Sequence, residues 1–433
     1  GTASLSWDDW AYLDITGRND VSSTLPSSNR SYFYPSFGGS IIVSQLLENN
    51  DIKTGALSFA KVRASWAEVG NDTDPYMLED YYNIQYLNGV LTSWRDNYKT
   101  NPNLKPESIR SSELGFDVRF FNNRLGLDFT WYKKNAFDQI LRIAVPPATG
   151  YQYEIVNAGN VQNKGIELAL NGLAVQKSNF SWNFVLNYSK NKNKIIELTD
   201  DTKVQVLSDG SVSFLKIVAE EGGEYGDLLG YTYQRNDAGQ IIVDDNGIPM
   251  RSEEMTKLGN YQPDWMMGFY NNFKIYGFDL GFLIDMRKGG DVYMGSLRTG
   301  AANGNLEMTL DNRETGFVVP NSVKADGTAN DKAILAQDYW SGISGITEEW
   351  IYDATNICFR ELNIGYTLPA SFSGKLKMNS IRLSLVGRNL FMISSKTKGF
   401  NPEGTYSTGN AQGLEYGTMP LLRSLGFNIN LNF

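Results

Sequence analysis

The 433-residue chain contains no histidine, and Cys358 is its only cysteine. Without histidine, the chain cannot form Ser-His-Asp or Cys-His catalytic arrangements or histidine-based zinc sites. A single cysteine cannot make an intrachain disulfide, so we expect Cys358 to be a packed, free thiol. An enzyme would have to work with carboxylates alone. We therefore expect no enzyme, and we assign no catalytic residue and no cofactor.

Long apolar runs and basic clusters are also missing. No run reaches the roughly 18 consecutive apolar residues that a transmembrane helix needs. The first nine residues lack the basic region and apolar core of a secretion signal, so we expect a piece of a longer protein. The formal net charge of -9 argues against nucleic acid as a partner. With 13% aromatic residues and 42 glycines, the composition favours strands and turns.

The last ten residues alternate between apolar and small or amide side chains. The apolar positions are Leu425, Phe427, Ile429, Leu431 and Phe433. Because successive side chains of a strand point to opposite faces, one face of this segment is wholly apolar. That pattern is typical of a strand with lipid on one side and a water-filled lumen on the other.

Similar alternating segments recur along the whole chain. We count twelve, at 10–16, 32–43, 60–66, 114–120, 125–131, 166–170, 182–188, 265–273, 278–286, 361–368, 381–388 and 424–433. The pair 114–120 and 125–131 is joined by Asn122-Asn123, which predicts a tight hairpin. No 20- to 50-residue period repeats, so propeller blades and solenoids are not supported.

The connections between these segments alternate in length. Short ones lie near 44–56, 122–123, 172–180, 274–277 and 369–379, and longer ones near 17–31, 67–110, 134–163, 191–264, 287–356 and 389–423. Outer-membrane barrels have short periplasmic turns and long extracellular loops. We therefore predict an all-β fold, a transmembrane antiparallel β-barrel that spans 1–433 as one domain. Its long extracellular loops lie near 67–110, 191–264, 287–356 and 389–423.

Several motifs resemble TonB-dependent receptor barrels. Asn101-Pro102-Asn103-Leu104-Lys105-Pro106-Glu107, followed by Ser112-Glu113-Leu114-Gly115-Phe116-Asp117, resembles the family's NPxLKPE…ELG segment, and Asn163-Lys164-Gly165-Ile166-Glu167-Leu168 resembles its N-x-G-[IV]-E motif. The last hundred residues are similar to the SusC/RagA branch, at 350–354, 360–369, 387–391 and 399–403. Asn356-Ile357-Cys358-Phe359 departs from the family's aromatic-Leu-Arg stretch.

This resemblance implies a nutrient importer of the outer membrane. Such proteins have about 22 strands around a plug, so this chain would be the carboxyl-terminal part of the barrel, with the plug and the TonB contact in the amino-terminal part. The implied partners are outer-membrane lipid, a SusD-like lipoprotein and TonB, and the expected substrate is a glycan oligomer before a peptide. The alternatives are a passive porin or structural outer-membrane protein, or a soluble β-rich carbohydrate-binding protein.

Aromatic residues in or beside the long loops are the candidate contacts for a ligand or partner. They are Trp94, Tyr98, Tyr339, Trp340 and Tyr406, with Trp350 beside them. Their rings could stack on sugar rings or on a docking partner. The other reading is a membrane-interface girdle, and the sequence does not choose between the two.

A weak calcium-loop pattern lies in the 191–264 connection. Asp244, Asn246, Gly247 and Glu253 have calcium-loop spacing, but Ile242 occupies the first position, where the pattern requires an acid. A hairpin with turns at 236–239 and 245–247 explains the same residues. The adjacent acids Glu220-Glu221, Glu253-Glu254 and Glu348-Glu349 could form a glycosidase pair, but we interpret them as solvated charge.

The terminal strand has a second interpretation. Phe427, Ile429, Leu431 and Phe433 resemble the signal that the outer-membrane assembly machinery reads at a barrel's carboxyl terminus. Simple lipid-facing residues would show the same pattern, and the two readings are compatible.

Overall fold

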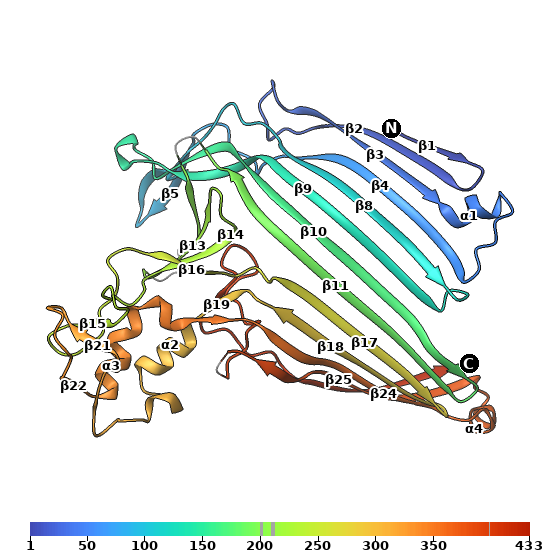
Figure 1. Ribbon diagram of the computed structural model, residues 1–433. Coiled ribbons are helices and arrows are strands. Elements are labelled where there is room, and N and C mark those ends of the chain that lie inside the picture. Colours follow the sequence, from blue (N-terminus) through green and yellow to red (C-terminus); the bar gives the residue numbers. More distant parts are fainter. Residues whose placement is uncertain (200–201, 209–212, 398) are drawn as a thin grey trace. The chain divides into compact units, whose positions relative to one another are not determined.

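The computed structural model describes residues 1–199, 202–208, 213–397 and 399–433. The chain divides into two compact units (Figure 1). Unit 1 comprises Gly1–Gln205, Glu220–Gly223 and Asn271–Lys274, and unit 2 comprises Val206–Ala219, Glu224–Tyr270 and Ile275–Phe433. No helix in the described residues is long and apolar enough to cross a membrane.

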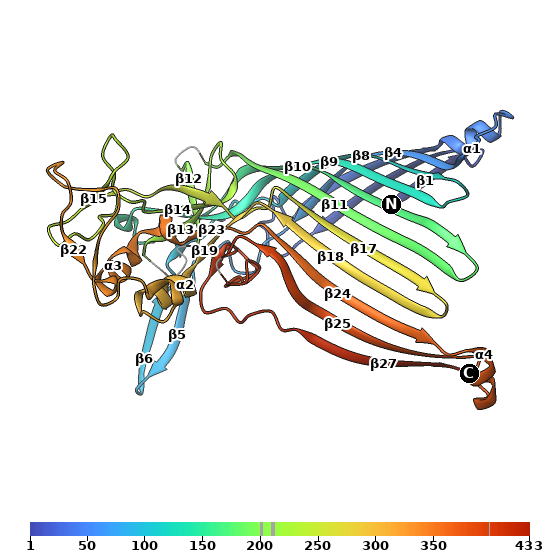
Figure 2. The same ribbon diagram turned by 60° about the horizontal axis from the view of Figure 1, so that its bottom comes forward.

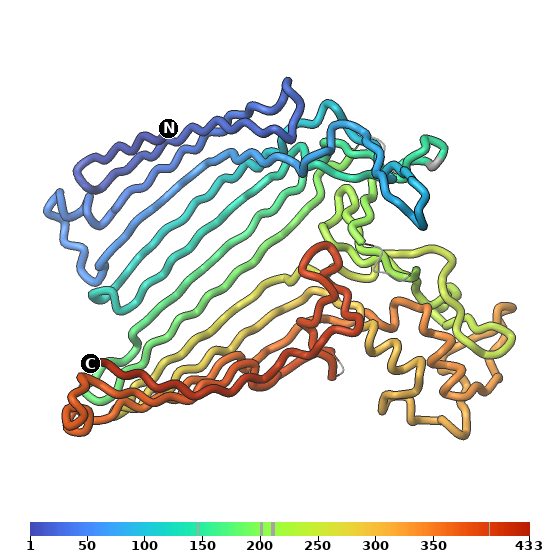
Figure 3. Tube along the Cα trace, turned by 180° about the vertical axis from the view of Figure 1, so that it is seen from behind, coloured from blue at the N-terminus to red at the C-terminus, as the bar shows by residue number. Residues whose placement is uncertain are grey.

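Unit 1 is an antiparallel wall of strands that follow one another in sequence order (Figure 3). These strands are β1 (Thr2–Trp7), β2 (Ala11–Val21), β3 (Ser31–Ile42), β4 (Leu57–Asn71), β8 (Glu107–Phe120), β9 (Leu125–Ala144), β10 (Tyr153–Lys177) and β11 (Phe180–Glu197). One end of the wall carries tight turns and α1 (Val43–Glu48), and we call it the turn end. The other, the loop end, carries β5 (Tyr82–Leu87), β6 (Val90–Arg95), β7 (Tyr98–Lys99) and the short η1 (Pro147–Thr149).

Unit 2 contains a second antiparallel wall. Its strands are β17 (Trp265–Ile275), β18 (Phe278–Lys288), β24 (Asn356–Thr367), β25 (Ser380–Ser395) and β27 (Ser424–Asn432), of which Asn271–Lys274 belong to unit 1. The end of this wall that carries the tight turn at 274–277 also carries α4 (Ala370–Ser373) and η5 (Gly374–Leu376), beside the carboxyl terminus, and we call it the turn end of unit 2 (Figure 1). The predicted face is present, because Leu383 and Leu385 pair with Ile429 and Phe427 and prolong the apolar stripe of β27 onto β25.

The all-β prediction is confirmed, but the strand count was one short. In the described residues the two walls contain thirteen strands, and the extra one is β1. β1 pairs with β2 from Thr2↔Thr16 to Trp7↔Ala11. Ala3, Leu5 and Trp7 alternate with Thr2, Ser4 and Ser6, so the period-two pattern is present, but it covers only six residues. Asp8 and Asp9, both with positive φ, form the turn that should have marked it.

The connection expected at 134–163 is also shorter than predicted. β9 continues to Ala144 and β10 begins at Tyr153. Beyond the apolar belt the backbone pairing of these strands continues to Tyr153↔Ala144, and Asn135 Nδ2 also donates to Asn160 Oδ1 at 2.8 Å. Apolar alternation therefore marked only the part of each strand inside the belt, because polar residues such as Asp138 and Gln139 interrupt it beyond.

The connections of unit 2 fold around a core of their own. Leu215, Leu228, Tyr293, Ile343 and Trp350 are fully buried in it. The elements are β12 (Val204–Ser208), which begins in unit 1, β13 (Leu215–Glu220), β14 (Tyr225–Gly230), β15 (Ile241–Val243), β16 (Thr256–Asn260), β19 (Asp291–Met294), α2 (Gly295–Ala302), η2 (Glu307–Thr309), β20 (Phe317–Val318), β21 (Ser322–Lys324), β22 (Ala333–Ile334), α3 (Ala336–Gly342), η3 (Ile343–Gly345), η4 (Thr347–Trp350), β23 (Ile351–Asp353) and β26 (Leu414–Glu415). These long loops are thus packed structure rather than loose linkers.

Replacing Trp350 with alanine tests that core. The side chain is 0% exposed and its Nε1 donates to the Ile343 carbonyl at 3.3 Å. Removing a buried tryptophan costs roughly 3–5 kcal/mol of stability. We expect faster hydrogen–deuterium exchange at 291–302 and 343–354 in the full-length protein in detergent. Trp94→Ala, at a 44% exposed position, is the matched control and should leave those peptides unchanged. Equal protection in Trp350→Ala would show that the loops do not depend on this core.

Candidate functional site

Exposed tyrosines line a cleft at the loop end of unit 1. The cleft encloses about 730 Å³, and its lining includes Tyr76, Glu79, Asp80 and Tyr81. The Tyr76 and Tyr81 rings meet edge to face with centroids 6.1 Å apart, and they are 75% and 41% exposed. Open aromatic faces beside carboxylates can stack on sugar rings while accepting hydrogen bonds from their hydroxyls.

A small core and a hydrogen-bond network hold this cleft. Leu25, Leu104 and Ile155 pack beneath it, with Met77 and Leu78 against them. Asp80 accepts hydrogen bonds from Thr100 Oγ1 at 2.9 Å and from the Tyr151 hydroxyl at 2.5 Å. Arg95 in turn donates to the Tyr151 oxygen at 2.9 Å. The Tyr151 hydrogen bond is the largest of the effects that lower the pKa of the Asp80 carboxyl below its ordinary value.

The β5–β6 hairpin leaves the loop end of unit 1 as a separate two-stranded ribbon (Figure 2). Its register places Tyr82, Ile84, Tyr86 and Leu91 on one face. Each of these side chains is at least 57% exposed. Trp94, a candidate from the sequence, lies on the opposite face and is 44% exposed. A ribbon with this much uncovered apolar surface is typical of an interaction site.

Tyr98 is less available than the sequence suggested. It packs against the Leu104 core, its hydroxyl donates to Asp96 Oδ2 at 3.0 Å, and the Arg142 guanidinium lies 4.8 Å from its ring centroid. Burial, followed by hydrogen bonding to Tyr81, raises the pKa of Tyr98 to about 12. Tyr98 supports the floor of the tyrosine cleft, with its ring face already occupied.

In unit 2 the candidate aromatics contact one another. Trp340 packs at 5.1 Å from Tyr339 and 6.2 Å from Trp350, by ring centroids. Tyr339 and Trp340 pack against the loop core, in which Trp350 is buried. Tyr406 differs, because its side chain is 53% exposed. Of this group, Tyr406 alone presents an open ring.

The weak calcium pattern forms a turn. Asp244 Oδ1 accepts backbone N–H bonds from Asn246 and Ile248, each at 2.9 Å, and Glu253 is exposed. Val243 bridges to Pro249 across that turn, which confirms the predicted hairpin. Among the described residues, no group of three or more acidic or cysteine side chains could hold a metal ion.

Two of the adjacent acid pairs are engaged within the protein. Glu348 binds Arg235 through two hydrogen bonds of 2.7 and 2.9 Å, and Glu349 Oε2 accepts from the Tyr233 hydroxyl at 3.0 Å. Glu221 forms a 2.9 Å ion pair with Lys203. These carboxylates therefore fasten loop segments together, whereas the prediction treated them as solvated charge.

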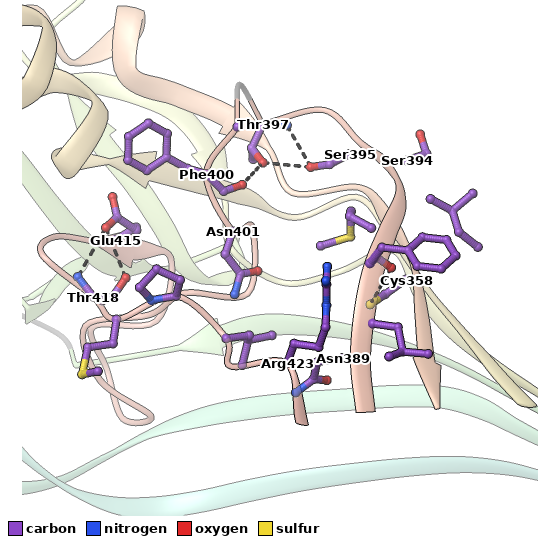
Figure 4. A pocket seen from close by; sticks show the side chains of 18 residues that line it. Cys358, Asn389, Ser394, Ser395, Thr397, Phe400, Asn401, Glu415, Thr418 and Arg423 are labelled. Carbon is purple, nitrogen blue, oxygen red and sulfur yellow. Dashed lines mark hydrogen bonds between the residues drawn. The ribbon is translucent and has the colours of Figure 1, made fainter. Parts of the chain in front are cut away.

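A second cleft, of about 650 Å³, lies within unit 2 beside the carboxyl-terminal part of β25 (Figure 4). It forms because β27 stops pairing at Arg388↔Ser424, while β25 continues to Ser395. Its lining includes Cys358, Phe391, Phe400, Met419 and Arg423. Cys358 is buried and free, as predicted.

An ion-pair network fixes the wall of this second cleft. Arg360 on β24 contacts Asp285 Oδ2 at 2.7 Å and Glu403 Oε1 at 2.5 Å, and its Nη1 donates to Asn389 Oδ1 at 3.2 Å. Glu403 belongs to the loop that returns to β27, so Arg360 anchors that loop to β24 and β18. Among the lining residues, the buried Glu415 carboxylate is already satisfied by Ser296 and Thr418.

Comparison with known proteins identifies the chain's relatives. The family model described as TonB dependent receptor-like, beta-barrel, matches residues 1–390. The chain belongs to this family. It is an outer-membrane barrel chain of a receptor and transporter family, which confirms the predicted location and overturns the soluble carbohydrate-binding alternative.

Individual relatives of this TonB-dependent receptor chain agree with that assignment. It is 28% identical to TonB-dependent receptor P3 of Formosa agariphila over 97% of this chain and 44% of that protein. It is 24% identical to TonB-dependent receptor SusC of Bacteroides thetaiotaomicron over 90% of this chain and 39% of that protein. It superposes on the RagAB peptide transporter with a TM-score of 0.78 and 21% identity, over 100% of this chain and 47% of that one. The chain thus spans less than half the length of these relatives.

Sequence reasoning missed the tyrosine cleft of this receptor chain. Tyr76, Tyr81, Tyr82 and Tyr86 fall within eleven residues of one predicted extracellular loop, and this density was the available signal. Of the five contacts predicted from the sequence, Tyr98, Tyr339 and Trp340 prove to be packed, whereas Trp94 and Tyr406 are exposed. Clustering of aromatic residues within one loop is the better indicator of an open surface.

Acidification tests the Asp80 network. Because the folded-state pKa of Asp80 lies below its ordinary value of 3.8, its stabilising bonds persist above that pH and are lost as pH falls through the lowered pKa. We place a spin label at Glu79→Cys in a Cys358→Ser background. The label should stay immobile between neutral and mildly acidic pH and become mobile once the pH falls below the lowered pKa of Asp80. Tyr151→Phe should move this transition to higher pH.

The matched control is Tyr153→Phe, because no hydrogen bond joins the hydroxyl of that neighbouring tyrosine to Asp80 in the described residues. The two variants would be compared by electron paramagnetic resonance across one pH series. Identical mobility profiles for Tyr151→Phe and Tyr153→Phe would mean that the Tyr151 bond does not set the pKa of Asp80.

Proposed function

We propose that the whole protein imports a nutrient across the outer membrane, driven by TonB acting on a plug that lies outside this chain. The family match over residues 1–390 is the observation that carries this proposal. In it, the loop end is extracellular and the turn end periplasmic, as the short turns and long loops indicate. A passive porin would need neither a plug nor a TonB contact.

We propose that further strands complete the barrel. β1 pairs only with β2, and β27 pairs only with β25, in the described residues. A strand edge in lipid leaves backbone N–H and C=O groups without partners, which is costly. A barrel of about 22 strands would cover both edges with strands from the rest of the protein.

A glycan oligomer is the proposed substrate. Tyr76 and Tyr81 offer open ring faces, and Glu79 and Asp80 offer acceptors in the same cleft. Sugar rings present apolar C–H faces and hydroxyl donors, so this combination suits them. A SusD-like lipoprotein is the proposed lid, and the exposed stripe Tyr82, Ile84, Tyr86 and Leu91 is its proposed contact on this chain.

A peptide is the second candidate substrate. In the described residues, Phe391, Met392, Ser394 and Ser395 of β25 pair with β24 but not with β27, so one strand edge borders the unit 2 cleft. An extended peptide can bind such an edge through its main chain. The similar RagAB protein is a peptide transporter, which is consistent with this candidate.

Purification of the full-length protein from outer membranes in mild detergent tests the import proposal. We expect a chain more than twice this length, a co-purifying lipoprotein, and glycan identified by mass spectrometry. Recovered peptide in place of glycan would favour the second candidate. A chain found only in the soluble fraction would contradict import altogether.

Substitution of the cleft tyrosines tests the substrate class. Stacking contributes about 0.5–1.5 kcal/mol per ring, so Tyr76→Ala with Tyr81→Ala should weaken binding of the recovered oligosaccharide roughly ten- to a hundredfold. Calorimetry on the full-length protein measures this. Tyr276→Ala removes a 74% exposed tyrosine at the turn end and should leave affinity unchanged. Equal affinities for all three proteins would exclude this cleft as the glycan site.

We also propose that the terminal strand is the assembly signal. Phe427, Ile429, Leu431 and Phe433 are between 43% and 82% exposed. They lie on one face of the strand, free to contact the assembly machinery before lipid covers them.

A further inference from the structure

Five lysines lie on the lipid-facing side of unit 1, along the loop-end border of its apolar belt. On β9, β10 and β11 the register aligns Lys133 with Lys164 and Lys164 with Lys192. Lys190 and Lys194 are two residues before and after Lys192 on the same strand, so they share its face. All five are exposed. We call this set the lysine row.

The register shows which face this is. One pair below the lysine row, Trp131 and Ile166 are partners, and Leu114 is the partner of Trp131 on β8. Leu114 and Trp131 are 52% and 40% exposed, as expected for side chains that meet lipid. The apolar alternation continues from there toward the turn end, through Phe129 and Leu168. Lys133, Lys164 and Lys192 therefore lie directly above the aromatic edge of the apolar belt, at the level of lipid headgroups, and Lys190 lies at that edge, opposite Ile166.

This arrangement opposes folding unless an anion offsets it. Like charges directly opposite on neighbouring strands are destabilising, since their Cβ atoms are about 4.5–5.5 Å apart. In the described residues, none of the five ammonium groups forms an ion pair. The nearest acid of that face on β4, Glu68, already pairs with Arg110 at 3.3 Å. Two cations on the opposite face do have partners: Arg63 pairs with Asp128 at 2.7 Å and Lys134 with Glu113 at 3.5 Å.

We propose that the lysine row binds the phosphate groups of a phosphorylated lipid whose acyl chains lie along the apolar belt below it. Lysine ammonium groups bind phosphate as point charges, and their long stems can reach from the belt to headgroup level. The site is continuous with the lipid-facing surface, which favours a lipid over a soluble anion. This site is independent of the nutrient-binding clefts and of import.

Titration of the delipidated full-length protein in mild detergent with diphosphorylated lipid A, followed by native mass spectrometry, tests the proposal. The variant is Lys133→Gln with Lys164→Gln and Lys192→Gln. Each lysine near a charged membrane surface contributes about 1 kcal/mol, so this variant should bind roughly a hundredfold more weakly. The charge-matched control is Lys53→Gln with Lys177→Gln and Lys375→Gln, three exposed lysines at the turn end, and it should bind like the unaltered protein.

Three further outcomes decide the chemistry. Lipid A without phosphates should bind weakly to every protein, and raised ionic strength should weaken binding of the diphosphorylated form. Millimolar inorganic phosphate should not compete; full competition would assign the row to a free anion and overturn the lipid proposal. Equal lipid binding by the lysine-row variant and the unaltered protein would also overturn it. Heat-modified mobility on gels verifies that each variant is folded, and calorimetry with oligosaccharide reports separately on the proposed import function.

Discussion

A backbone in contact with lipid must satisfy its own hydrogen bonds, because hydrocarbon offers no donor or acceptor. In both units this requirement produces long antiparallel strands, each paired along most of its length with a neighbour in the wall. The apolar alternation follows from the same constraint, since only alternate side chains face lipid. The proposed nutrient clefts and the proposed lid contact lie beyond the belt, where water relaxes the constraint and loops can fold.

That constraint explains how much of the fold the sequence predicts. Where lipid imposes apolar alternation, as from Leu425 to Phe433, strand position and face are readable from the sequence, and the structure agrees. Above the belt, β9 and β10 continue through backbone pairing to Tyr153↔Ala144, but amide and charged side chains such as Asn135 and Asn160 break the alternation, so this part resembles a loop in sequence. β1 was missed for a different reason: Ala3, Leu5 and Trp7 do alternate with hydroxyl residues, but the pattern is only six residues long and begins on a small side chain, and the Asp8-Asp9 turn was not recognised.

The candidate sites were less predictable, because aromatic residues serve two purposes in loops. Trp350 and Trp94 both lie in or beside long loops in the sequence. In the structure, Trp350 is fully buried in a loop core, whereas Trp94 is 44% exposed on a hairpin. The difference depends on partners distant in the chain, such as Ile343 and Tyr293 for Trp350, and a local pattern does not contain them. Tyr76 and Tyr81 were not predicted, because they form a candidate site only through the packing of their rings against each other and the hydrogen bonds of the neighbouring Asp80.

Whether a charged side chain has an ion-pair partner distinguishes a binding surface from the scaffold more clearly than the presence of aromatic residues does. Arg360, Arg235 and Arg63 all have carboxylate partners, and each holds two segments of the chain together. The lysine row has no such partner although three of its members stand directly opposite one another, so its cost to the fold is not offset within the described residues. The lipid-facing positions below the lysine row are apolar or aromatic. A row of cations without partners at headgroup level therefore has a physical reason only if the surrounding membrane supplies the anion.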